Sequence, residues 1–442
     1  MDKSTKIRLN EEPKKLLKNE TFKDELKHVI EEVLKVYNSD FSKEDFEKVR
    51  AEPDKYNLGL YRFDNDISQT ILSNSKCVEL MKSDELVKPH IGSLVGGPMY
   101  HRRFDTAEEY IIFLIQHYYI ETKLRGKSID LDKLCDEFVD FFYNDTLLIR
   151  KKCILHNFDF DGESIELAQG ITIRKISEDE KKEYKIPTKD ELYSCEYKRK
   201  KTDDVTISDF LIEAYILANK YISNKHTNEQ TSQDLNIVLN DVITSIRILK
   251  PASTYCDNEV RTKIITFSPG IGGDWINTSL YTSYTPGGIS KFSQSEANEL
   301  ALIYQNYKAI LKDIRFKITS SRLYFGIERR NFMDKIIDYI IGLESAYLPG
   351  FNTELRFQLS LRCSFLLNGN DVGKAEDDYK FLKDMYKLRN DIVHGNEIGF
   401  EKLSFENCNR LENILRKTIK LWLLNPEKFL AKNLEKLYFS PK

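Results

Sequence analysis

The sequence predicts a mainly α protein with a smaller mixed α/β region and a C-terminal antiparallel helical bundle. Apolar side chains recur at helical three- and four-residue steps in the first 150 residues, and the alternation typical of strands appears only between residues 151 and 290. A purely helical signal then continues to the end of the chain. We therefore expect three domains: a mainly helical region at 1–150, a mixed α/β domain at 151–290 and the bundle at 291–442.

The composition is that of an ordinary globular protein. The chain has 442 residues, of which 41% are hydrophobic and 31% charged, so it is long enough to bury several cores and is neither disordered nor collagenous. No apolar run reaches 18 residues, and the N-terminus lacks the apolar core of a signal peptide. Seven scattered cysteines without a C-x-x-C pair fit reduced core thiols. We expect a cytoplasmic protein with no membrane partner.

The charge is unevenly distributed along the chain. The net charge of -3 excludes a protein that coats nucleic acid through a global basic field. Residues 291–442 nevertheless contain 25 Lys+Arg against 20 Asp+Glu, whereas residues 1–290 contain 42 against 50. The C-terminal third is thus the better place for a phosphate-bearing partner.

Helices dominate the predicted N-terminal region. The first is indicated by apolar side chains at helical spacing: Phe22, Leu26, Val29, Ile30, Val33 and Leu34. Thr106 and Glu109 have capping-box spacing ahead of an apolar run at 111–115, and residues 131–141 continue the helical period. The glycine-containing stretch 92–97 is predicted to be a loop.

The middle region mixes strands with one helix. Apolar residues alternate with polar ones on both sides of Gln169-Gly170, which predicts a hairpin over 165–176. A helical stripe at 237–249 is stopped by Pro251, and a strand is predicted at 263–267. Residues 268–290, rich in glycine and proline, are the most loop-like stretch, so the main domain boundary is placed there.

The helical spacing of apolar residues in the C-terminal region indicates long helices joined by short links. This arrangement predicts an antiparallel bundle. The predicted helices span 294–314, 322–348, 353–368, 376–394 and 402–424.

The helix at 376–394 contains an unusual group of polar residues. At ~100° per residue, its buried stripe is predicted to contain Leu382, Met385, Tyr386, Ile392 and Val393. Arg389 falls within about 20° of Leu382, in the middle of this stripe, where a guanidinium is costly unless it is paired or serves a site. Asn390 and His394 lie at the edge of the stripe, one turn apart, and Gly395 follows as a helix-stopping residue.

These three side chains suit phosphodiester chemistry without a metal. Because imidazole ordinarily has a pKa of about 6.5, His394 can exchange a proton with a ribose 2′-OH or with the leaving oxygen. Arg389 can stabilise negative charge on a pentacoordinate phosphorus, and Asn390 can orient the imidazole or bind a phosphate oxygen. One histidine cannot be acid and base at once, so two copies of the site facing each other in a dimer would complete the chemistry.

A structural interpretation stays open beside the catalytic one. Arg389 can pair with a carboxylate such as Glu344 to lock the bundle, and His394 can cap a helix C-terminus, where a cation is favoured. The remaining histidines show no spacing typical of zinc ligands, and no P-loop, G-x-S-x-G or H-E-x-x-H motif occurs. We therefore expect no metal and no cofactor.

The sequence Arg-Asn-Asp-Ile-Val-His-Gly at 389–395 resembles the Arg-(4 to 6 residues)-His motif of HEPN domains, and specifically the ApeA-like HEPN family of bacterial anti-phage proteins. Further segments around the motif resemble the same family and follow one another in the same order: Leu343-Glu344-Ser345-Ala346, Glu354-Leu355, Leu361-Arg362-Cys363, Leu366-Leu367 and Met385-Tyr386. The resemblance is strongest over 322–396 and extends weakly upstream through 171–174 and 246–249. Residues 1 to about 145 show none.

The resemblance implies a metal-independent endoribonuclease that dimerises through its bundle, cuts RNA by 2′-OH attack and acts in abortive infection. It implies that Arg389 and His394 are the catalytic pair, that Asn390 is their polar neighbour and that Glu344 supports Arg389. The RNA, whether tRNA, rRNA or mRNA, is left open. Asn396 stands where HEPN toxins controlled by nucleotidyltransferases often carry tyrosine, so control by tyrosine modification is not expected.

We expect the first 290 residues to sense or restrain the nuclease, because a stand-alone cytosolic nuclease must be restrained in a healthy cell. The acidic N-terminal part is then expected to occlude a basic RNA groove until a phage-derived trigger binds. The alternative is a non-catalytic HEPN module for dimerisation or RNA binding in a defence or toxin–antitoxin system.

Overall fold

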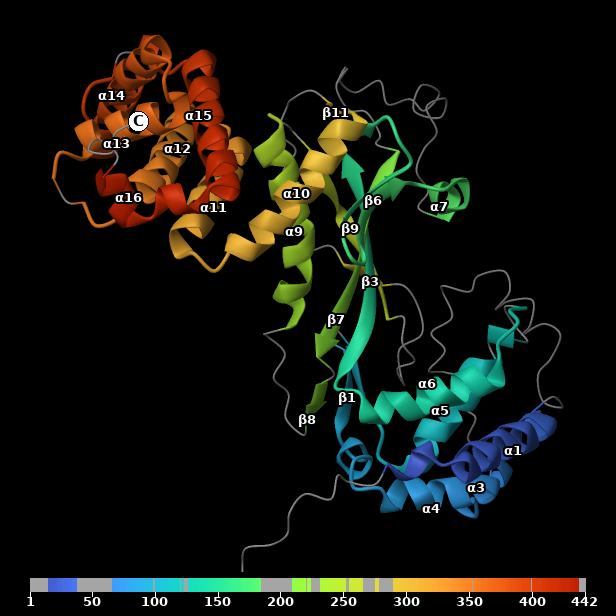
Figure 1. The fold of residues 1–442 in the computed structure, drawn as a ribbon. Coiled ribbons are helices and arrows are strands. Elements are labelled where there is room, and N and C mark those ends of the chain that lie inside the picture. The colour runs from blue at the N-terminus through green and yellow to red at the C-terminus, as the bar shows by residue number, and fades with distance from the viewer. Residues whose placement is uncertain are drawn as a thin grey trace, which may run out of the picture. The chain divides into compact units, whose positions relative to one another are not determined.

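The computed structural model of the chain is mostly helical, with a smaller sheet region (Figure 1). It describes residues 15–37, 66–97, 100–119, 121–122, 126–183, 209–219, 221–223, 231–251, 254–264, 275–277, 289–351, 353–398 and 400–436. The predicted fold class, mainly α with a smaller mixed α/β region, is confirmed.

The chain divides into two compact units. The first comprises Met1–Lys151, Tyr215–Leu235 and Arg261–Ile276, and the second comprises Lys152–Ala214, Asn236–Val260 and Asn277–Lys442. Each unit thus combines segments that are distant in sequence. The predicted division into 1–150, 151–290 and 291–442 stays a prediction.

The helices of the first unit share one hydrophobic core. They are α1 (Glu20–Tyr37), α3 (Asp66–Ser73), α4 (Lys76–Ser83), α5 (Ala107–Tyr119) and α6 (Leu131–Tyr143), with short 3-10 helices at Leu16–Lys18 and Lys88–His90. Phe22, Leu26 and Ile30 of α1 are fully buried there. Asp130 caps α6 by accepting hydrogen bonds from the backbone N–H groups of Asp132 and Lys133. The helices predicted from periodicity in this region are confirmed.

A small antiparallel sheet in this unit corrects one prediction. The strands β1 (Leu94–Gly97), β2 (Tyr100–Arg103) and β8 (Tyr221–Ser223) lie in the order β2-β1-β8. The prediction of a loop over 92–97 is therefore wrong for β1. Leu94 pairs with Arg103 on one side and with Ser223 on the other. Backbone pairing on both sides stabilises a strand whose glycines alone disfavour it.

Six further strands form the larger sheet in the order β10-β9-β3-β7-β6-β5. They are β3 (Thr146–His156), β5 (Ser164–Ala168), β6 (Ile171–Lys175), β7 (Phe210–Asn219), β9 (Tyr255–Ile264) and β10 (Trp275–Asn277). The predicted hairpin is confirmed as β5 and β6, with Ile165 opposite Ile173 and Gly170 at a φ of 75° in the turn. The predicted strand at 263–267 corresponds to the end of β9, and residues 265–267 lie outside the described residues.

Helix α9 (Thr231–Leu249) ends before Pro251, as predicted. Two short strands, β4 (Phe158–Phe160) and β11 (Ser290–Phe292), pair in parallel, and α7 (Glu178–Glu183) follows β6.

The bundle of the second unit consists of consecutive helices with short links. They are α10 (Gln294–Ile310), α11 (Ile314–Glu328), α12 (Phe332–Tyr347), α13 (Leu355–Asn368), α14 (Val372–His394), α15 (Phe405–Leu424) and α16 (Ala431–Glu435), with 3-10 turns at Phe400–Lys402 and Pro426–Phe429. The single helix predicted at 322–348 is wrong, because the chain breaks at 329–331 into α11 and α12. Asn331 causes the restart, since its Oδ1 accepts from the N–H of Met333 at 2.8 Å.

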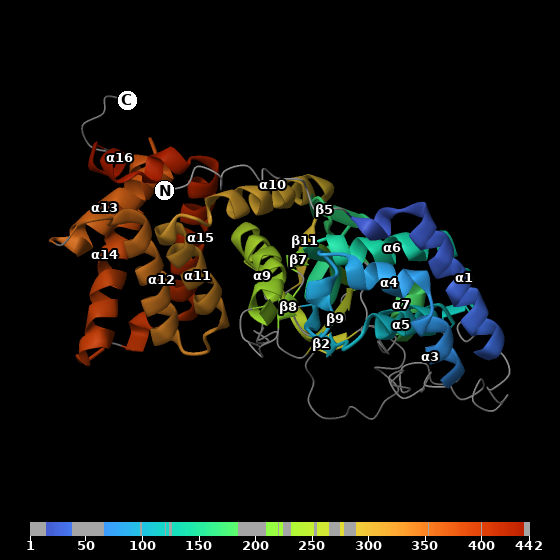
Figure 2. The same cartoon turned by 90° about the horizontal axis from the view of Figure 1, so that it is seen from below.

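The end of α9 contributes to the core of the bundle. Figures 1 and 2 both show α9 beside α10. Ile248 belongs to the bundle's hydrophobic cluster, and the fully buried Arg247 donates to Oε1 of Glu328 at 3.1 Å. The guanidinium of Arg247 also lies over the ring of Tyr324, 4.5 Å from its centroid. The bundle therefore depends on a residue far upstream of its own helices.

Candidate active site

Helix α14 ends immediately after the motif residues. Gly395 adopts a left-handed conformation with a φ of 70°, and the N–H of Asn396 donates to the carbonyl of Asp391 at 2.9 Å. Glycine suits this position because other residues pay a steric cost there. The turn fixes His394 as the last residue of the helix.

The buried face of α14 differs from the prediction at its C-terminal end. Leu382, Met385 and Tyr386 are buried as predicted, but Val393 is 51% exposed. Helix α14 has 23 residues and is longer than its neighbours α12 and α13, which have 16 and 14. The prediction that Val393 is buried is therefore wrong, because periodicity shows which face is apolar and not how far neighbouring helices cover it.

Arg389 is held by Glu344 of α12. The Arg389 Nη2 lies 3.5 Å from Oε2 of Glu344, and both side chains are 22% exposed. The Arg389 Nη1 also donates to Oδ1 of Asn390 at 3.0 Å. The pairing with Glu344 that the sequence suggested is present, and it fixes the guanidinium at the edge of the core.

Tyr386 completes this arrangement from one turn earlier on α14. Its phenolic hydroxyl donates to Oε1 of Glu344 at 2.7 Å. Burial, together with this hydrogen bond to a carboxylate, raises the pKa of Tyr386 far above its usual value. The phenol therefore stays a proton donor at neutral pH and holds one carboxylate oxygen while the other faces Arg389.

His394 lies apart from this network. It is exposed on the last turn of α14, and no hydrogen bond or ion pair connects it to another residue in the described part of the chain. The fold thus brings Arg389, Asn390 and Glu344 together and leaves the imidazole of His394 at the exposed rim, one helical turn beyond Asn390.

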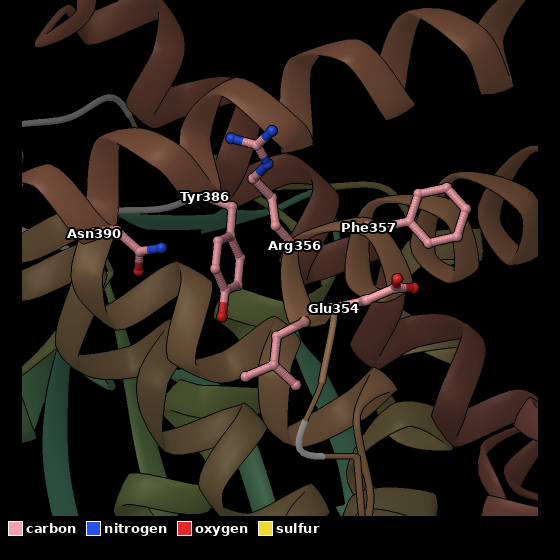
Figure 3. A pocket seen from close by; sticks show the side chains of 6 residues that line it. Glu354, Arg356, Phe357, Tyr386 and Asn390 are labelled. Atoms are coloured by element: carbon pink, nitrogen blue, oxygen red, sulfur yellow. The ribbon is translucent and has the colours of Figure 1, made fainter.

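A shallow depression lies beside Asn390. It has a volume of about 610 Å³ and is lined by Glu354, Leu355, Arg356, Phe357, Tyr386 and Asn390. Figure 3 shows Asn390 and Tyr386 of α14 on one side and residues from the start of α13 on the other. Sequence reasoning assigned no role to Arg356 or Phe357. Periodicity within one helix contains no signal for a depression that two helices form together.

The described residues contain no group of three or more His, Cys, Asp and Glu side chains arranged to hold a metal ion. In the same part of the chain, no helix combines the length and apolar character needed to cross a bilayer.

A search with this chain finds no matching family model, no matching curated protein and no matching solved structure.

Proposed function

We propose that the protein is a HEPN-type, metal-independent endoribonuclease that acts in the cytoplasm as an anti-phage abortive-infection effector. The observation that supports this proposal best is the placement of Arg389, Asn390 and His394 at the end of α14, with the guanidinium held by Glu344. An oriented guanidinium and an accessible imidazole at the end of the same helix provide the two groups that cleavage of a phosphodiester needs.

In the proposed reaction, the ribose 2′-oxygen attacks the neighbouring phosphorus. The O2′–P bond forms and the P–O5′ bond breaks, which leaves a 2′,3′-cyclic phosphate and a 5′-hydroxyl. An imidazole takes the proton of the 2′-OH, and an imidazolium gives a proton to the leaving 5′-oxygen. Arg389 stabilises the negative charge on phosphorus. Because the Oδ1 of Asn390 accepts from Arg389, its amide N–H groups are directed elsewhere and can donate to a phosphate oxygen.

The two proton transfers require two imidazoles, and this motif provides one. We therefore propose a homodimer through the bundle in which two His394 side chains face a shared RNA strand. The exposed apolar side chain of Val393, adjacent to His394, is consistent with a contact between copies at this place. The excess of basic residues in 291–442 favours RNA as the partner.

The upstream part of the chain is proposed to restrain the nuclease until a phage-derived trigger binds. Residues 1–290 carry more acidic than basic side chains, so they can compete with RNA for a basic surface. Because Arg247 and Ile248 belong to the interior of the bundle, this proposal is best tested with substitutions and not by deleting residues 1–290.

The test is incubation of total cellular RNA in EDTA with the purified full-length protein, followed by mapping of the cleaved ends. The variants are His394→Ala and the matched control His28→Ala, an exposed histidine on α1. We expect 2′,3′-cyclic phosphate ends with wild type and with His28→Ala, and none with His394→Ala. If the purified wild-type protein cleaves no RNA, the assay is repeated in phage-infected lysate. Equal cleavage by His394→Ala would contradict the assignment.

A second candidate is a non-catalytic module for dimerisation or RNA binding. The observation that favours it is that Arg389 already has a structural partner in Glu344 while His394 makes no polar contact among the described residues. A module of this kind keeps phage protection after His394→Ala, whereas a nuclease loses it.

A further inference from the structure

We propose that the depression between α13 and α14 binds a nucleotide of single-stranded RNA next to the bond that is cut, with its base stacked on Phe357 and its phosphate on Arg356. This inference rests on the proposed nuclease function and deepens it. It assigns the substrate as unpaired RNA and names the residues that hold it.

The depression is continuous with the proposed catalytic residues. Asn390 lines it and accepts the 3.0 Å hydrogen bond of Arg389. Its volume of about 610 Å³ falls in the range of sites that bind small organic molecules, so a nucleotide fits. A strand whose scissile phosphate lies at Arg389 would place a neighbouring nucleotide in the depression.

Phe357 has the properties of a stacking platform. Its side chain is 43% exposed, although a phenyl group gains free energy from burial. The ring of Tyr379 lies nearly perpendicular to it at a centroid distance of 6.3 Å. An accessible aromatic ring stacks any base, which is how proteins commonly hold single-stranded RNA.

Arg356 is available for a phosphate. No hydrogen bond or ion pair joins its guanidinium to the described residues, in contrast to Arg362, which donates to the carbonyl of Tyr347, and Arg410, which pairs with two aspartates. In Figure 3 the guanidinium of Arg356 and the carboxylate of Glu354 point in different directions. The charge of Arg356 is therefore not cancelled by the acidic residue that lines the same depression.

The rest of the depression is mostly apolar. Tyr386 lines the depression but is almost fully buried, and its hydroxyl is occupied by Glu344, so it adds no free polar group. Leu355 adds an aliphatic surface. An apolar floor with an arginine and an amide at its rim matches the chemistry of a base attached to a phosphate.

The first experiment is photocrosslinking with short single-stranded RNA that carries 5-iodouridine, using full-length His394→Ala so that the RNA stays intact. We expect crosslinks on Phe357. Binding of the same RNA, measured by fluorescence anisotropy, should weaken about tenfold in Phe357→Ala and recover in Phe357→Trp. Arg356→Gln should weaken binding and reduce the salt dependence by about one phosphate contact. The controls are Phe405→Ala, an exposed phenylalanine on α15, and Arg330→Gln.

The outcomes separate the two proposals. Loss of binding in Phe357→Ala and Arg356→Gln with unchanged controls supports the RNA site. If wild type cuts RNA while Phe357→Ala cuts it equally fast at the same positions, the depression is not the nucleotide site and the nuclease proposal stands. If wild type neither binds nor cuts RNA, either as the purified protein or in phage-infected lysate, both proposals are overturned. Crosslinks confined to other residues also overturn the site.

Discussion

Oε1 of Glu344 accepts the hydroxyl of Tyr386 at 2.7 Å, while Oε2 of the same carboxylate lies 3.5 Å from the guanidinium of Arg389. One acidic residue of α12 therefore positions two residues of α14 that are three positions apart. The motif arginine cannot turn freely, because both its partner and the residue that orients that partner belong to the packed bundle.

Glu344→Gln should weaken both the bundle and the proposed nuclease. The amide carries no charge, so Arg389 loses its ionic partner, and we expect the free energy of unfolding to fall by about 1 kcal/mol because the pair is partly exposed. Urea denaturation measures this loss, and Asp384→Asn, an exposed change on α14, is the control. Unchanged stability together with unchanged RNA cleavage would show that Glu344 does not position Arg389.

Tyr386→Phe removes only the hydroxyl group that orients Glu344. We expect a loss of about 1 kcal/mol in the free energy of unfolding. In a double-mutant cycle with Glu344→Gln, the two losses should not add fully, because a neutral amide oxygen accepts the Tyr386 hydroxyl more weakly than a carboxylate does. Additive losses would mean that the hydroxyl of Tyr386 is stabilised elsewhere.

Val393→Asp should disrupt the proposed homodimer. A carboxylate at this exposed apolar position would be desolvated in a contact between copies. Val372→Asp is the matched control, since Val372 is also an exposed valine of α14 but lies at the opposite end of the helix. Light scattering after size-exclusion chromatography should give a lower mass for Val393→Asp alone. The same mass for both variants would place the dimer contact elsewhere.

Gly326→Ala should destabilise the packing of α11 against α12. A Cβ at this position would lie 2.2 Å from the ring of Tyr339, which is fully buried and cannot move aside. We expect a loss of about 2 kcal/mol, as for overpacked cores. Gly373→Ala on α14 has room for the methyl group and should be stabilising by about 0.5 kcal/mol. Thermal unfolding of the two variants should therefore shift in opposite directions.

The free energy of unfolding of the second unit should decrease at acid pH, partly because of Glu180. Arg174 donates to both carboxylate oxygens, at 2.7 and 2.8 Å, and this hydrogen bonding, with help from Lys152, holds the pKa of Glu180 well below its usual range. A depressed carboxylate pKa stabilises the fold above the unfolded value of about 4.3, and the stabilisation is lost as the pH falls below it.

Glu180→Gln should therefore make the free energy of unfolding less dependent on pH between about 5 and 2. Glu166→Gln, at an exposed position on β5, should leave that dependence unchanged. Equal acid dependence in wild type and Glu180→Gln would mean that the ion pair does not contribute.

The local pattern of apolar and polar residues was sufficient to predict most helices and the hairpin at Gly170. An amphipathic helix or alternating strand shows its buried face in its own sequence, so α1, α6, α15 and the β5–β6 pair were predictable. The break between α11 and α12 was missed because arginines at 329 and 330 interrupt no periodicity, and only the cap at Asn331 signals it.

The site was predictable to the extent that it lies on one helix. Arg389 is conspicuous in the sequence because a cation on an apolar face needs a partner, and Glu344 is a carboxylate that can serve as that partner. The depression and the exposure of Val393 depend on where α13 meets α14 and on the relative lengths of the helices. These properties arise only when separate segments pack, so no spacing within a single segment can reveal them.

The buried Arg247 of α9 limits how this gene can be rearranged. A recombination event that transferred only the segment from Gln294 onward to another protein would leave Glu328 inside the bundle without its cation and Tyr324 without the group above its ring. The apolar surface of the bundle that Ile248 covers would also be exposed to water. The bundle can be inherited as a module only together with α9, so exchange of the segment that precedes it is constrained by the need to keep this one arginine.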